Sequence, residues 1–93
     1  MIIGILTVEL LVPGSNSLKD KRQVVKSLLA NIRNKFNVSA AEMDNLDSHR
    51  RAGLAFACVS NDRGMANRML DKIINYIQSN PLCEIGESDM EFL

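Results

Sequence analysis

The first twelve residues contain the feature that most restricts what this chain can fold into. Residues 2–12 are rich in Ile, Val and Leu and end at Pro13-Gly14, which predicts a β-strand followed by a turn. Alternate side chains of a strand point to opposite faces, and here both sets are largely apolar. One set is Ile2, Gly4, Leu6, Val8 and Leu10, and the other is Ile3, Ile5, Thr7 and Glu9. Such a strand is expected at the centre of a sheet, covered on both sides.

A helix is predicted from residue 18 to about residue 36. Ser17 and Asp20 resemble a capping box at its start, and Asn37 is available as a stop. At 100° per residue, the apolar side chains form one narrow stripe, which predicts the buried side of the helix. The stripe consists of Leu18, Val25, Leu29, Ile32 and Phe36, flanked by Leu28.

A second amphipathic helix is predicted before Pro81, ending near residue 80, with Ser60, Asn61 and Asp62 as possible N-caps. Between the helices, residues 38–43 and 52–60 are predicted strands separated by a polar loop, residues 44–51. The tail, residues 82–93, alternates imperfectly, as a strand with a bulge does. The element order is therefore βαββαβ.

Two right-handed crossovers with this order predict a single α+β domain over residues 1–93, a ferredoxin-like two-layer sandwich. Its sheet order is 4-1-3-2, with both helices on one face. The other face then stays open although Ile3 and Ile5 point to it. We expect this open face to be covered by a second copy, giving a dimer through the sheet, or by another partner.

Composition excludes several classes of protein. The chain has 93 residues and a net charge of zero, so its overall charge does not indicate any particular class of binding partner. No apolar run approaches the roughly 20 residues of a membrane helix, and no signal peptide is recognisable, which predicts a cytosolic location. Cys58 and Cys83 have no CxxC motif or His cluster beside them. We expect both to be small buried hydrophobes, and we expect no metal and no cofactor.

The zero net charge conceals an asymmetry along the chain. Residues 17–35 contain six basic residues and one acidic residue, Asp20, whereas Glu84, Glu87, Asp89 and Glu91 crowd the last strand. Lys19, Arg22, Lys26 and Arg33 fall on one flank of the first helix, and Lys21 and Lys35 fall on the other.

Two interpretations of this basic stripe remain open. It could contact an RNA backbone, with Arg50 and Arg51 as outlying candidates. Alternatively, it could be a structural flank, either solvated with aliphatic stems that cover the edge of the core or paired with the acidic tail of a neighbouring chain. Aromatic residues that could stack on bases are scarce, since the chain has three Phe, one Tyr and no Trp.

An enzyme needs titratable groups that converge in space. The candidates are Asp44, Asp47, His49 and Asp62, with Glu42 nearby. A lone His among polar loop residues is more often a solvated side chain, and Asp62 is better placed to cap a helix. We therefore expect no catalytic site.

Several short motifs occur in order along the chain, namely Pro13-Gly14, Ser17-Leu18-Lys19-Asp20-Lys21-Arg22, Phe36-Asn37-Val38-Ser39, Ala41-Glu42, Asp47 and Val59-Ser60-Asn61-Asp62. Together they resemble the YlxP-like family of bacteria, a domain family of unknown function. The resemblance covers nearly the whole chain and implies a βαββαβ fold without an established activity. Members are often encoded beside translation initiation and ribosome-maturation factors, which implies a connection to RNA or the ribosome.

Taken together, these features predict a non-enzymatic cytosolic domain, homo-oligomeric through its sheet, with an accessory role on ribosomal or other structured RNA. The alternatives are a protein-interaction module that uses the open sheet face and a small-ligand-binding module at a dimer interface.

Overall fold

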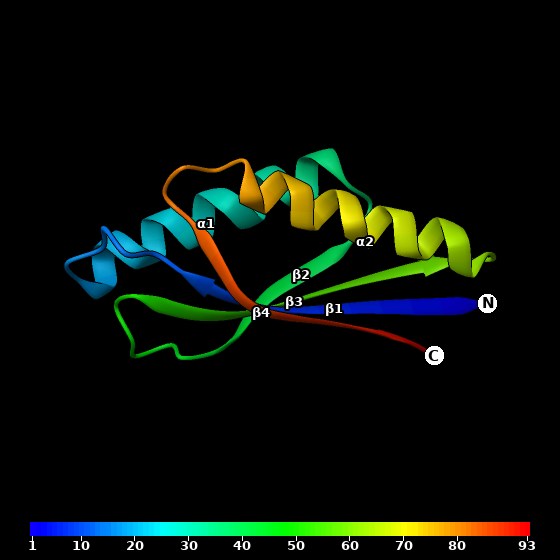
Figure 1. The fold of residues 1–93 in the computed structure, drawn as a ribbon, viewed down its shortest axis with the longest axis horizontal. Helices are drawn as coiled ribbons and strands as arrows, with labels where there is room; N and C mark the ends of the chain where they lie inside the picture. Colours follow the sequence, from blue (N-terminus) through cyan, green and yellow to red (C-terminus); the bar gives the residue numbers. More distant parts are fainter.

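Two helices cover one face of a four-stranded antiparallel sheet in the computed structural model, which describes residues 1–93 (Figure 1). The elements are β1 (Ile2–Leu11), α1 (Leu18–Lys35), β2 (Ser39–Asp44), β3 (Arg51–Ser60), α2 (Arg63–Gln78) and β4 (Glu84–Phe92). Across the sheet the strands follow the order β2-β3-β1-β4, which is the predicted order read from the other edge. The ferredoxin-like α+β prediction is confirmed, with element ends that differ from the predicted ones by one or two residues.

Both helices begin at capping residues that the sequence indicates. The Ser17 hydroxyl accepts a hydrogen bond from the Asp20 amide at 3.1 Å. The Asp20 carboxylate accepts from the Asn16 amide at 3.2 Å, one residue earlier than in a standard capping box. Of the three possible caps of α2, Asp62 is the one used, since its carboxylate accepts from the Met65 amide at 3.0 Å.

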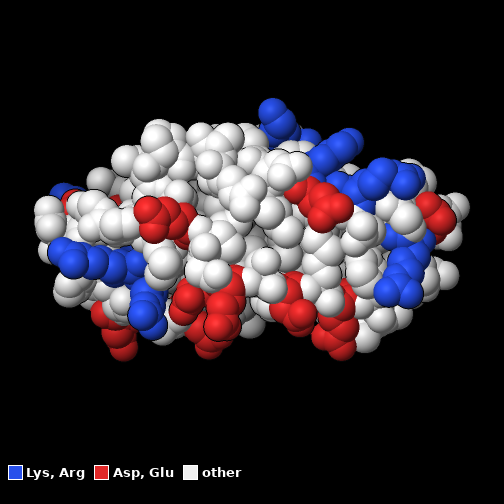
Figure 2. Space-filling view, viewed as in Figure 1, with Lys and Arg blue, Asp and Glu red and all other residues white.

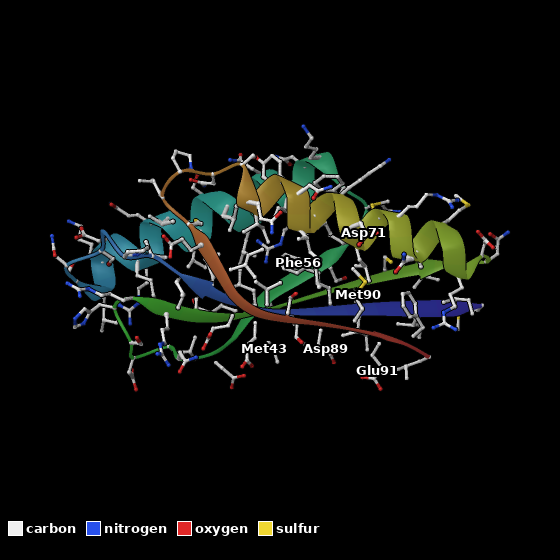
Figure 3. All side chains as sticks on the ribbon, in the orientation of Figure 1. Met43, Phe56, Asp71, Asp89, Met90 and Glu91 are labelled. Carbon is white, nitrogen blue, oxygen red and sulfur yellow. The ribbon has the colours of Figure 1, made fainter.

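The hydrophobic core lies between the sheet and the two helices. On β1 the side chains of Leu6, Val8 and Leu10 are buried there, as the period-two pattern predicts. Phe56 of β3 and Met90 of β4 also point toward the helices (Figure 3). The opposite side of the sheet has no covering layer (Figure 1).

The sheet is regular at its centre and irregular at both edges. β1 and β3 pair without interruption from Ile2 opposite Ser60 to Leu11 opposite Arg51. β2 has a register shift between Glu42 and Asp44, and the pairing of β4 shifts between Val8 and Leu10 of β1, which confirms the irregularity predicted in the last strand. Because Asp44 pairs with Gly53 and Gly53 pairs with Glu9, the two irregularities lie at one level across the sheet.

Candidate functional site

Four exposed basic side chains of α1 form a line that we call the basic flank: Lys19, Arg22, Lys26 and Arg33. The flank lies on the side of α1 that borders β2, because the Arg33 guanidinium donates to the Ala40 carbonyl oxygen of that strand. The other side of α1 meets α2, where the Lys35 ammonium lies 5.4 Å from the centre of the Tyr76 ring. At 1.5 Å per residue, the flank extends about 21 Å along the helix.

No carboxylate of α1 shares this flank. Asp20 is the only acidic residue of the helix, and it lies about 130° round the axis from the middle of the basic flank. Its carboxylate is also engaged, since it accepts a hydrogen bond from the Asn16 amide. The four positive charges are therefore not neutralised within their own helix.

The structure separates the two outlying arginines that the sequence grouped together. The Arg50 Nε donates to the Ser15 carbonyl oxygen at 3.0 Å, which holds this side chain near the start of α1. Arg51 instead pairs with Leu11 on the uncovered side of the sheet, where its Nη1 lies 3.9 Å from the Glu9 carboxylate. Arg50 therefore lies near the N-terminal end of α1, and Arg51 lies on the opposite side of the sheet from the helices.

The sequence placed Lys21 on the flank of α1 that lies away from the basic flank, and the structure shows that Lys21 is not solvated there. Its side chain is fully buried. The ammonium lies 3.0 Å from the Glu42 carboxylate and also donates to the carbonyl oxygens of Asn45 at 2.9 Å and Arg51 at 3.2 Å. A signal for this burial exists in the sequence, because Lys21 precedes Val25, Leu28 and Ile32 by four, seven and eleven residues, the spacing of one helix face.

The contacts of Lys21 give it a structural role. They join α1 to both ends of the loop between β2 and β3, which begins at Asn45 in the left-handed conformation (φ 61°). An ammonium that is enclosed by protein oxygens is unavailable to an outside phosphate. Lys21 therefore stabilises the loop and does not belong to the basic flank.

The uncovered side of the sheet, which we call the open face, has an apolar part and an acidic part. Ile5 pairs with Ala57 on one side and with Glu91 on the other, and Thr7 pairs with Ala55 and Asp89. Directly paired residues share a face, so at Ile5 and Thr7 the apolar side chains lie over β1 and β3 and the neighbouring carboxylates lie over β4. Figure 3 shows Asp89 and Glu91 pointing away from the helices, and Figure 2 shows acidic side chains in a row along the sheet side.

A hollow of about 310 Å³ opens on this face where the two edge strands are irregular. Four carboxylates line it, and we call it the acidic hollow: Glu9, Asp44, Glu87 and Asp89. Gly53 and Gly86 lack the Cβ atoms that would clash with the side chains of Asp44 and Glu9, respectively. A Cβ atom on Gly53 would lie 2.7 Å from the Asp44 Cβ, and one on Gly86 would overlap the Glu9 carboxylate.

Asp47 and His49, two of the titratable groups considered for catalysis, are exposed in the loop between β2 and β3, and the other three occupy different parts of the molecule. Glu42 pairs with Lys21 on the helix side, Asp44 lines the open face, and Asp62 caps α2 beyond the far end of β3. No three His, Cys, Asp or Glu side chains are grouped so as to hold a metal ion. Burial raises the pKa of the Cys83 thiol, which favours its unreactive neutral form.

These observations define a small ferredoxin-like α+β domain with a basic helix flank and an acidic open face. The chain belongs to the family described as "Protein of unknown function (DUF503)", which it matches over residues 3–90. It is 35% identical over 83 residues to "Uncharacterized protein YlxP" of Bacillus subtilis (strain 168), an alignment that covers 89% of this chain and 90% of that protein. The resemblance to the YlxP-like family is thereby confirmed. Neither of the two helices is long and apolar enough to cross a membrane.

Proposed function

We propose that this chain is a cytosolic, non-enzymatic accessory protein that binds the phosphate backbone of structured RNA, including ribosomal RNA, along the basic flank. The observation that supports the proposal is the line of four exposed cations with no carboxylate among them. A line about 21 Å long spans several phosphates of one RNA strand, and Arg50, which is held near the N-terminal end of α1 by Ser15, is an outlying candidate contact.

The proposed contacts are electrostatic and mostly independent of base sequence. Arg33 keeps free N–H donors after its bond to the Ala40 carbonyl, because a guanidinium has five. The acidic open face repels phosphate, so RNA on the basic flank lies against the α1 and β2 side of the molecule.

The test compares two variants that each lose four positive charges. One is K19Q/R22Q/K26Q/R33Q, which removes the basic flank, and the control is K35Q/R63Q/R68Q/K72Q, which removes cations located elsewhere. Protein stripped of nucleic acid in high salt is titrated against labelled ribosomal RNA fragments over a range of salt concentrations. The flank variant is expected to flatten the dependence of log K on log salt by about three units of slope, and the control by less than about one.

Equal loss of affinity in the two variants would show that only net charge matters, and unchanged affinity in the flank variant would refute the proposal. Thermal unfolding of both variants checks that the fold is retained. No binding of wild-type protein at low salt would also refute it.

A second candidate function, a protein-interaction module, is favoured by the bare open face. Val59 is 68% exposed, and Ile3 and Ile5 are only partly buried. The dimer predicted through this face remains a prediction. Sedimentation of the wild type and of A57E, which places a charge in the apolar part, tests whether a second copy binds there.

A further inference from the structure

We infer that the open face binds a basic segment of another protein, whose Arg or Lys side chain enters the acidic hollow while apolar side chains cover the Ile3 and Ile5 end. The inference deepens the second candidate function and is independent of RNA binding, because the basic flank belongs to α1 and the open face belongs to the opposite side of the sheet.

Charge decides which kind of partner fits this face. Six carboxylates belong to it: Glu9, Asp44, Glu84, Glu87, Asp89 and Glu91. Its one cation is Arg51, which already lies beside Glu9. A second copy stacked symmetrically on this face would bring two sets of carboxylates together with only two arginines between them, which electrostatic repulsion disfavours.

RNA is also a poor occupant of the open face. Carboxylates repel phosphates, and RNA-binding sheets of this fold class stack bases on aromatic side chains. The aromatic residues of this sheet, Phe56 and Phe92, lie on the helix side, because Phe56 is in the core and Phe92 pairs with Gly4 and packs against the core. A positively charged protein segment is the occupant that can neutralise the carboxylates of the open face.

The acidic hollow offers a basic side chain acceptors from three strands. Asp44 comes from β2, Glu9 from the central β1, and Glu87 and Asp89 from β4. An arginine presents five N–H donors in a planar fork, which suits carboxylates placed on several sides of one space. The missing Cβ atoms of Gly53 and Gly86 leave room for the Asp44 and Glu9 side chains beside the hollow.

The apolar part of the open face fixes a second property of the partner. Ile3 lies six residues from Glu9 along β1, which is about 20 Å in a strand. Apolar side chains of the partner should therefore lie about 20 Å from its basic group. That distance corresponds to about six residues in an extended segment or about 13 in a helix.

The experiment selects random 16-residue peptides displayed on phage against the full-length chain. Enriched peptides are then synthesised, and their affinity is measured by fluorescence anisotropy for wild type, E87Q/D89N, A57E and the charge-matched control D47N/D71N. We expect enrichment of Arg or Lys together with apolar residues. We expect affinity to fall about tenfold in E87Q/D89N, because carboxylates facing the basic group are removed, and to stay unchanged in D47N/D71N.

Several results would overturn the inference. These are no enrichment over an unrelated immobilised protein, enrichment of acidic or uncharged peptides, or equal affinity for E87Q/D89N and the control. If the wild type is a dimer and A57E is a monomer, a second copy of the chain covers the open face. If A57E weakens RNA binding, RNA occupies the open face. The variant K19Q/R22Q/K26Q/R33Q should still bind the peptides, which distinguishes this inference from the proposed RNA binding.

Discussion

The two sides of β1 are similarly apolar in sequence and yet differ in the structure. Leu6 is fully buried beneath the helices, whereas Ile5, its neighbour in the chain, lies partly exposed on the open face between Ala57 and Glu91. The difference arises because both right-handed crossovers place their helices on the same side of the sheet. A strand that is apolar on both faces thus indicates that both faces need a covering layer. The chain topology decides which of the two faces is covered by the protein's own helices.

The largest expected loss of folding stability comes from a substitution on the helix-covered side of β1. Leu6→Ala should lower the free energy of unfolding by about 4 kcal/mol, because it opens a cavity in a fully buried site. Ile5→Ala on the open face should cost less than about 1.5 kcal/mol, because that side chain has no covering layer. Urea denaturation at low protein concentration measures both, and similar costs would mean that the open face is covered in solution.

A slightly smaller effect is expected from the one charged side chain buried on the covered side. Lys21→Met should lower the free energy of unfolding by about 3 kcal/mol, because it leaves the Glu42 carboxylate and two loop carbonyls without their donor. Lys19→Met on the basic flank should change it by less than about 0.5 kcal/mol. Adding Glu42→Leu to Lys21→Met should restore part of the loss, and a further equal loss would contradict the pairing.

The smallest effect concerns thiol chemistry on the two sides of the sheet. Burial raises the pKa of Cys83, so alkylation of this thiol should be slow. The comparison is a cysteine introduced on the open face by Thr7→Cys, and the alkylation of Cys83 should accelerate only at a higher pH than the alkylation of this introduced cysteine. Residue-specific mass spectrometry after iodoacetamide treatment between about pH 7 and about pH 10 measures both rates. Faster alkylation of Cys83 than of the introduced cysteine would contradict its burial.

The same pKa shift links stability to pH. The folded-state pKa of Cys83 lies above its unfolded value, so its contribution to stability is complete below the unfolded pKa and is lost as the pH rises through the folded pKa. Denaturation of wild type at alkaline pH should therefore show a small loss of stability beyond the ordinary thiol pKa, and a gain would contradict this sign.

The candidate surfaces were predicted unevenly from the sequence. The basic flank follows from helix periodicity alone, because residues 19, 22, 26 and 33 belong to one helix whose geometry is regular. The acidic hollow was missed, since it depends on two edge irregularities and on two glycines from different strands meeting at one level. Arg50 and Arg51 are adjacent in the chain and were grouped, but consecutive residues at a strand end point in different directions.

The sequence by itself determined the element order, the central place of β1, the caps Ser17 and Asp62 and the basic flank. Each depends on residues within a few positions of one another or on the general handedness of crossovers. Only the tertiary structure decided that Lys21 pairs with Glu42 and that carboxylates from three strands surround one hollow. Those features depend on strand register and on packing between distant segments, which local periodicity does not encode.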